Sequence, residues 1–570
     1  YRSASPISIN WDFTLSLYNE NCNTDQISNF DNDFGVIVNG LGKILRTLKS
    51  MIHARTELIM RKIWIRLLAG CLAVLINLTT TGTVWASTPK KTGDPKFQGI
   101  PLQCYVSLAD AGTSPEAKVA AYTEIAGQYL EFQSPDRAKK VLEKSIATAQ
   151  DIVNPSLKAF ALLDTAGRLT KASDLKLAAD TLDNTLKIAK DLPDPVDRVF
   201  AYIKIAQAYG EAGKKEKAQN LLDTTIKATP EVIDPYARSR AFAAISNVYT
   251  ELGDDFKSES AISEATQLLL MIENRNIKNR AQVEIAGSYA QAGNHAQAIA
   301  SLSKVFQEFD AIRDTAIAAA KDAAKNAKSA KKSLPKTATK DVKKEDSSEE
   351  NAAPPDPQVV EQTETANAEI LKTRSLFLVA SQYLVGKQYD KALEVIANLD
   401  AKSMEKNIGI ANVAIAYAKD KKTDEAIKLL AQSLEGLDAF PPSIDGFNLL
   451  IEVGRQYQSL NKTEEAKQVW GKASSLAKKL TQPAQRLLAL NIMASNYGEF
   501  GLIDQVEPIL QDSFALTKTA PDPNIRSRAF SDISSAYWAI GQRNKAKEIA
   551  KEIENPKEQE QLGKLFTCAS

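Results

Sequence analysis

The chain has 570 residues, too many for one ordinary hydrophobic core, so either several domains or a repeat array is expected. Lys and Arg number 71 and Asp and Glu number 70, and this near-cancellation argues against nucleic acid as a partner, which would favour a basic surface. Apolar residues recur at helical rather than alternating spacing, which predicts an all-α protein.

The first segment of the chain shares no pattern with the rest of the sequence. Residues 1–59 carry no sustained apolar period, and a basic segment then starts at Met60. We therefore expect translation to begin at Met60, and residues 1–59 to be disordered or absent from the native protein.

The next segment is typical of a secretory signal peptide. Residues 60–86 combine a basic start, an apolar run at 67–78 and small residues before a predicted cleavage between Ala86 and Ser87. The run is short for a transmembrane span, so the mature protein is expected to contain none. An uncleaved membrane anchor through 67–78 is the alternative. A lipoprotein-type site at Cys71 is disfavoured because most of the run follows it.

After a lead-in at 87–114, an internal repeat of 40 residues extends over 115–310. One register holds Tyr129, Leu169, Tyr209, Tyr249 and Tyr289, and another holds Ala126, Ala166, Ala206, Ser246 and Ala286. The pattern returns over 366–553, where the large register holds Tyr383, Tyr417, Tyr457, Tyr497 and Tyr537, with a first step of 34 residues. About ten repeats in two blocks are predicted.

Each repeat is expected to be two helices. In the third repeat, Asp194 and Pro195 form a helix start, because Asp caps and Pro fits the first helical position. Gly213 marks the turn between the helices, since Gly tolerates positive φ. Equivalent turn glycines are Gly253, Gly293, Gly386, Gly501 and Gly541. Ala206 lets the paired helices approach closely, and stacking of neighbouring repeats closes the core.

This repeat resembles that of the tetratricopeptide (TPR) family. The third repeat supplies the matching residues Tyr202, Ile205, Ala206, Tyr209, Gly213, Ala218, Leu222 and Pro230, and it departs from the family at Thr225 and in its six extra residues. The resemblance implies a helical-hairpin repeat solenoid, a TPR-like superhelix. Armadillo or HEAT-type units of similar length are the alternative.

The segment between the blocks, 311–365, changes in composition. Ala316 to Lys332 is rich in Ala and Lys and predicts an exposed helix, whereas Ser333 to Thr365 lacks the apolar content to fold and predicts a disordered linker. We expect two separately folded lobes. The alternative is that 316–332 forms a degenerate repeat and joins the blocks into one superhelix. Residues 554–570 are expected to be a C-terminal tail.

Two cysteines remain after the predicted cleavage site, Cys104 and Cys568. A disulfide needs Cα atoms within about 7 Å, and stacked helices lie about 10 Å apart. Ten stacked repeats should therefore separate the two cysteines widely. Free or intermolecular thiols are predicted.

Signals of catalysis are missing from the sequence. The chain has two histidines, of which His53 precedes the signal segment and His295 follows a turn glycine, where exposure is expected. No Cys-x-x-Cys, His-Glu-x-x-His or Gly-x-Ser-x-Gly motif occurs, and no Gly-Lys pair is followed by Ser or Thr. No catalytic residue, metal site or cofactor is predicted, and an enzyme is the third and least favoured class of function.

The resemblance to the TPR family implies a binding groove on the concave face, lined by the first helix of each repeat. The positions carried over are Gln207, Arg240, Asn247, Glu251, Arg280, Arg374, Arg455, Asn491, Arg528 and Trp538. Four arginines share one register and offer a row of guanidinium groups for acidic partners. The competing interpretation is a solvated face whose arginines form weak ion pairs within their own repeats.

The resulting hypothesis is an exported scaffold, in a periplasm, a lumen or the medium, that binds polypeptide segments on the concave faces of two arrays. The alternative is a structural element that assembles with itself or with an envelope complex.

Overall fold

The computed structural model describes residues 99–333, 356–400 and 403–570. Within these ranges the regular structure is helical and contains no strand, so the all-α prediction is confirmed. None of the described helices is long and apolar enough to cross a membrane. The predicted leader at 1–59, the signal peptide at 60–86 and linker residues 334–355 lie outside the described residues.

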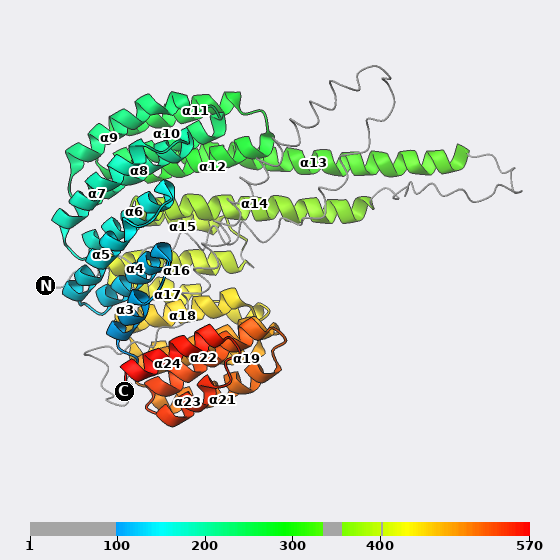
Figure 1. Cartoon of the computed structure of the whole chain (residues 1–570). Coiled ribbons are helices and arrows are strands. Elements are labelled where there is room, and N and C mark those ends of the chain that lie inside the picture. The colour runs from blue at the N-terminus through cyan, green and yellow to red at the C-terminus, as the bar shows by residue number, and fades with distance from the viewer. Residues whose placement is uncertain (1–98, 334–355, 401–402) are drawn as a thin grey trace, which may run out of the picture. The chain divides into compact units, whose positions relative to one another are not determined.

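Ten helical hairpins follow one another in the described part of the chain, as predicted, in a TPR-like helical-hairpin solenoid (Figure 1). The hairpins are α4 (Pro115–Glu131) with α5 (Pro135–Ala149), α6 (Pro155–Lys171) with α7 (Leu175–Lys190), α8 (Pro195–Glu211) with α9 (Lys215–Ala228), α10 (Pro235–Glu251) with α11 (Asp255–Leu268), α12 (Arg275–Gln291) with α13 (His295–Ser333), α14 (Pro357–Val385) with α15 (Tyr389–Ala397), α16 (Met404–Lys419) with α17 (Thr423–Ser433), α18 (Ile444–Ser459) with α19 (Thr463–Lys479), α20 (Pro483–Glu499) with α21 (Ile503–Thr519), and α22 (Pro523–Ala539) with α23 (Arg543–Ala550). They are flanked by α3 (Leu102–Asp110) and α24 (Pro556–Cys568).

The predicted helix starts are confirmed by their caps. The Asp194 carboxylate accepts a hydrogen bond from the Val196 amide at 2.8 Å, and Pro195 occupies the first helical position of α8. The same signal begins α14, where Asp356 accepts from the Gln358 amide at 2.9 Å. Residues 357–365 are therefore helical, which corrects the prediction of a disordered linker there.

The chain turns between the two helices of a hairpin through one residue with positive φ. Gly213 has φ 72° and Gly541 has φ 82°. In the sixth hairpin the predicted turn glycine, Gly386, has φ −74°, and Lys387 after it takes the positive value of 57°. The turn position was therefore assigned one residue too early in that hairpin.

The first helices of the hairpins form the inner layer of the array. Successive first helices, such as α8, α10 and α12, contact one another directly, and second helices contact the next first helix. Among the described residues, successive second helices contact one another far less. The more closely packed layer of a bent array lies on the inside of the bend. The first helices therefore form the concave side. We call the surface of the first helices that faces away from the second helices the inner face.

The two blocks of repeats pack as one continuous array. Helix α14 contacts both α12 and α13, and Figure 1 shows α13 and α14 side by side. One core cluster contains Ala286 and Ala298 of the first block together with Val379 and Tyr383 of the second. The prediction of two separate lobes is therefore wrong. The Ala/Lys segment is helical as predicted, but it extends α13 rather than forming a degenerate repeat.

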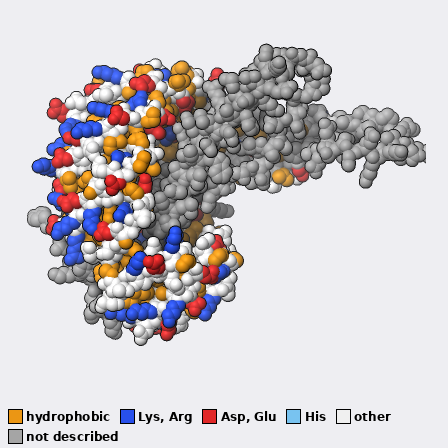
Figure 2. Space-filling view, viewed as in Figure 1, with side chains coloured by type: hydrophobic (Ala, Val, Ile, Leu, Met, Phe, Trp, Pro, Cys, Tyr) orange, Lys and Arg blue, Asp and Glu red, His pale blue; other side chains and the backbone are white. Residues whose placement is uncertain are grey.

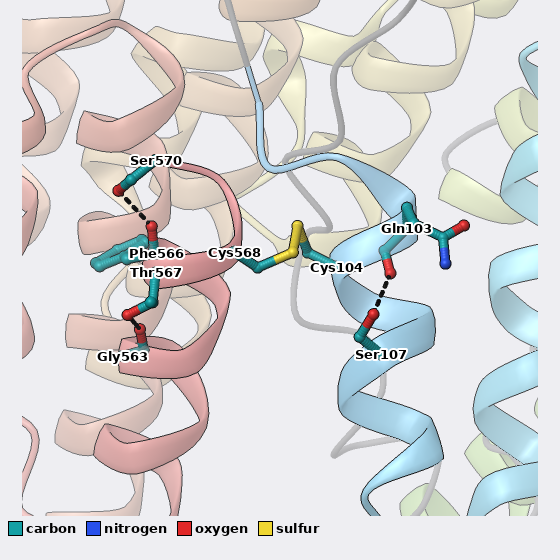
Figure 3. The surroundings of a disulfide bond; sticks show 8 residues. All are labelled: Gln103, Cys104, Ser107, Gly563, Phe566, Thr567, Cys568 and Ser570. Atoms are coloured by element: carbon teal, nitrogen blue, oxygen red, sulfur yellow. Dashed lines mark hydrogen bonds between the residues drawn. A yellow bond between two sulfur atoms is a disulfide. The ribbon is translucent and has the colours of Figure 1, made fainter.

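The two ends of the described array also meet. Helix α3 contacts α24, and a disulfide joins Cys104 to Cys568 with their Cα atoms 5.7 Å apart (Figure 3). The prediction of two separated thiols is wrong because it treated the stack as straight, whereas the array bends. The predicted tail at 554–570 is likewise mostly the helix α24, capped by Asn555.

Candidate functional site

Two candidate positions on the inner face, Gln207 and Glu251, belong to a ladder of hydrogen bonds between successive first helices, which Gln291 completes. The Gln207 amide of α8 donates to both carboxylate oxygens of Glu251 on α10 at 3.3 Å. Gln291 of α12 donates to the same carboxylate at 3.2 Å. The surrounding protein raises the pKa of Glu251 by desolvation, and the two amide donors oppose that shift. The carboxylate is thus held by neutral donors from both neighbouring hairpins.

Asn247 lies one helical turn before Glu251 on α10. Its side-chain oxygen is shielded from solvent and has no hydrogen-bond partner among the described residues. Its backbone carbonyl accepts from Gln291 at 3.4 Å. Shielded side-chain oxygens in native structures nearly always accept a hydrogen bond, so this oxygen is an exception in the inner layer.

The arginines of the predicted row are paired within the array. Arg240 Nε donates to Glu284 at 2.8 Å, and Arg280 lies 3.8 Å from the same carboxylate. The Arg240 guanidinium also lies over the rings of Phe200 and Tyr236, 5.6 and 5.5 Å from their centroids. Arg280 therefore pairs with a carboxylate of its own helix, whereas Arg240 pairs with a carboxylate of the next hairpin, so both guanidinium groups already have partners within the array.

In the second block, the candidate arginines also have partners. Arg455 of α18 donates to the Asn496 side chain at 3.0 Å, and its charge favours the ionised form of Glu131 on α4, a residue of the first hairpin. Arg528 of α22 favours the ionised form of Asp532. Arg374 is half-buried on α14.

Two of the candidate positions are buried rather than exposed on the inner face. Asn491 is 4% exposed, accepts from Ser513 at 2.9 Å and donates to Asp532 at 3.3 Å. Trp538 is 2% exposed and stacks on Phe566 of α24 with ring centroids 4.3 Å apart. Helix α24 packs over this end of the array, so these two positions do not line an open groove.

Asp532 stands out electrostatically in this covered region. Burial raises its pKa to about 7, with a smaller contribution in the same direction from Glu558. The charge of Arg528 and the hydrogen bond from Asn491 oppose the shift. Asp532 in turn adds to the effect of burial in raising the pKa of Tyr105 on α3, so the two ends of the array are electrostatically coupled.

Sequence reasoning missed a triad that recurs between hairpins. The Tyr249 hydroxyl donates to Asp223 of the preceding hairpin at 2.6 Å, and Lys257 donates to the same carboxylate at 2.8 and 3.0 Å. Asp183 receives the equivalent bonds from Tyr209 and Lys217. The signal was an Asp at a fixed distance before the register tyrosine and a Lys at a fixed distance after it.

Where the two blocks of repeats meet, a histidine rather than an aspartate contacts the register tyrosine. His295 Nδ1 lies 2.7 Å from the Tyr383 hydroxyl, and its Nε2 lies 3.5 Å from the Glu394 carboxylate. The residue was expected to be a solvent-exposed turn histidine. It bridges α13 to α14 and α15, because the register tyrosine of the second block reaches it.

Apolar side chains are exposed at the loops that connect one hairpin to the next. Val153 is 93% exposed, Ile233 91%, Leu270 83% and Met271 62%. Figure 2 shows charged side chains of both signs interspersed with apolar ones over the visible face. No group of three or more His, Cys, Asp or Glu side chains in the described ranges is placed to hold a metal ion.

Comparisons with known proteins give only distant structural similarity. No protein-family model matches the sequence, and no curated protein matches it significantly. The solved structure of Ton1535 from Thermococcus onnurineus NA1 is 16% identical, over 72% of this chain and 98% of that chain, with a TM-score of 0.28. A putative kinesin light chain with nearly identical TPR-like repeats from Podosopora anserina is 16% identical, over 35% of this chain and 97% of that chain, with a TM-score of 0.26. A Rap protein complexed with Competence and Sporulation Factor is 11% identical, over 72% of this chain and 99% of that chain, with a TM-score of 0.25. Similarity at this level assigns no function to the chain.

Proposed function

We propose that the chain is an exported interaction scaffold that binds a polypeptide segment along the inner face of α8, α10 and α12. The observation that carries the proposal is the Glu251 carboxylate, which belongs to an exposed residue of the inner face and is held in place by the Gln207 and Gln291 amides. A backbone N–H of an extended segment is a donor of the right kind for this carboxylate.

Export is part of the proposal. It is supported by the basic and apolar pattern of residues 60–86 in the sequence. The Cys104–Cys568 disulfide also supports an oxidising compartment, since disulfides persist there and are rare in the cytosol. N-terminal sequencing of the mature protein tests the point. A start at Ser87 is expected, and retention of residues 67–78 would favour the membrane-anchored alternative.

The binding proposal is tested by affinity capture from the exported compartment, followed by a peptide array of the captured proteins. The Asn247→Ala and Glu251→Ala variants should lose the peptides that the unmodified chain binds. The matched control is Asn220→Ala, which changes an exposed residue of α9 in the outer layer. Binding that is equal in all three variants, or no bound peptide at all, excludes the inner face as the site.

A second candidate function is self-assembly through the exposed apolar loops. Ile233, Leu270 and Met271 belong to two successive connections and are largely exposed. Light scattering of the unmodified chain and of an Ile233→Glu, Leu270→Glu double variant distinguishes the two. A concentration-dependent oligomer that the double variant loses supports self-assembly, and a monomer in both cases excludes it.

We propose a non-catalytic role because the motifs of nucleophilic, metal-dependent and phosphate-binding enzymes are missing from the sequence. Hydrolase or transferase activity that co-purifies with the unmodified chain and is lost on a single substitution in it would overturn this part.

A further inference from the structure

The disulfide that joins the ends of the array is asymmetric in its exposure. Cys104 on α3 is 4% exposed and belongs to a core cluster, whereas Cys568 near the end of α24 is exposed to solvent. Figure 3 shows the two side chains reaching across from one helix to the other. A solvent-exposed disulfide is open to thiol exchange, while a structural one is usually buried.

The helix held by this bond is short and packs more extensively against α4 of the first hairpin than against α24. Helix α3 has nine residues, and no side chain caps its start after Pro101. Ile100, two residues before α3, is fully buried in the same cluster as Phe566, and Tyr105 packs against that cluster. Asp110 at the end of α3 also accepts hydrogen bonds from Tyr122 and Lys144 of the first hairpin, so α3 has a partner to stay with when it leaves α24.

We propose that the Cys104–Cys568 disulfide is a redox-controlled clasp. In the oxidised protein it holds α3 on α24 and closes the array. In the reduced protein α3 leaves α24, and the array opens between its first and last hairpins. This inference does not depend on what the inner face binds.

The exchange step follows from the exposure of the two sulfurs. A thiolate of a dithiol reductant attacks the sulfur of the exposed residue Cys568, forms a mixed disulfide with it and releases Cys104 as a thiolate, which takes up a proton. The second thiol of the reductant then displaces Cys568, which is also protonated. Two electrons pass to the protein, and the reductant leaves as its own disulfide.

The experiment compares the oxidised full chain with the same protein treated with dithiothreitol, by hydrogen–deuterium exchange. Reduction should raise the exchange rates of the amides in α3 and α24 at least tenfold, while those of α8 and α10 stay unchanged. The unchanged helices serve as the folding control. Non-reducing peptide mapping should find Cys104 linked to Cys568 before treatment and not after it.

The matched variant is the double substitution Cys104→Ser, Cys568→Ser, which leaves the rest of the sequence unchanged. It should exchange like the reduced protein and should not respond to dithiothreitol. If α3 stays equally protected in the oxidised protein, the reduced protein and the double variant, the clasp is overturned. It is overturned also if no linked peptide is found in the untreated protein.

Discussion

At the scale of single residues, the side-chain volumes in the two helices of a hairpin compensate each other. A small residue of the first helix and a large residue of the second recur at fixed positions, as with Ala206 and Leu222, which are both fully buried in one cluster. The eighth hairpin keeps this compensation with different residues, because Gly454 replaces the Ala and Trp470 replaces the Leu. A Cβ added at Gly454 would lie 2.2 Å from the Trp470 Nε1.

This compensation predicts strong coupling between the two positions. Gly454→Ala should lower the free energy of unfolding by about 1–3 kcal/mol through overpacking. Trp470→Leu should lower it by about 2–5 kcal/mol through a cavity. The double variant Gly454→Ala, Trp470→Leu restores the pair used in other hairpins, so it should be more stable than the sum of the single effects implies. Chemical denaturation measures all four proteins, and additive effects would contradict the compensation of volumes.

The turn residues carry a second prediction. Ser173 has φ 63° in the same role as Gly213 with φ 72°, and a non-glycine residue in that region is strained. Ser173→Gly should therefore raise the free energy of unfolding by about 0.5–1 kcal/mol. The control, Gly213→Ala, should lower it by about 1 kcal/mol or more. Thermal melts followed by circular dichroism decide the sign, and a loss of stability in Ser173→Gly would count against strain at the turn.

At the scale of elements, the features predicted correctly from the sequence are those that neighbouring residues determine. The Asp-Pro starts and the apolar spacing gave the ten hairpins, because caps and helical period are properties of neighbouring residues. The start of α14 at Pro357 carried the same signal but was hidden in a Pro-rich, charged segment. The partners of Arg240 and His295 were not predictable, since they come from other hairpins and depend on how the helices pack.

The triad between hairpins makes a prediction about pH. Partial burial acts to raise the pKa of Asp223, but hydrogen bonds from Lys257 and Tyr249 and the charge of Lys257 leave it lowered. A carboxyl whose folded pKa is lowered adds stability above its unfolded pKa of about 4, and this stability is lost as pH falls through the folded value. Because Asp223 is 43% exposed, the contribution should be small, about 0.5–1 kcal/mol.

The test compares Asp223→Asn with Asp180→Asn, which changes an exposed carboxylate of α7. At pH 7 the first variant should be less stable than the unmodified chain by the amount above, and the difference should shrink towards pH 3. The second variant should match the unmodified chain throughout. Urea denaturation at several pH values gives the result, and a loss for Asp223→Asn that persists unchanged at pH 3 would exclude a role for its charge.

At the scale of the whole array, the prediction from the sequence was wrong where it depended on the curvature of the array. The distance between Cys104 and Cys568 was judged from the number of repeats alone. The direct contacts between successive first helices bend the array at every step, so small rotations add up over ten hairpins. Helices α3 and α24 meet as a result. The total bend of the array cannot be predicted from the residue pattern or from the spacing within one repeat.

The closing of the array therefore depends on the number of hairpins, and this can be tested by deleting one of them. Removing residues 195–234 takes out α8, α9 and their connection. It places Tyr249 and Lys257 at the spacing from Asp183 that Tyr209 and Lys217 now have, so the triad and the core register are restored. The shortened chain should remain folded, with the same mean residue ellipticity, because each hairpin contacts mainly its neighbours.

The same deletion should abolish the disulfide. With one step of rotation removed, α3 and α24 no longer meet, and Cys104 and Cys568 should be found as thiols by non-reducing peptide mapping after expression in an oxidising compartment. The full-length chain treated in parallel is the control and should show the linked peptide. A linked peptide in the shortened, folded chain would mean that the ends are brought together by their own affinity rather than by the summed curvature of the hairpins. A chain that loses its helicity would contradict the independence of the repeats.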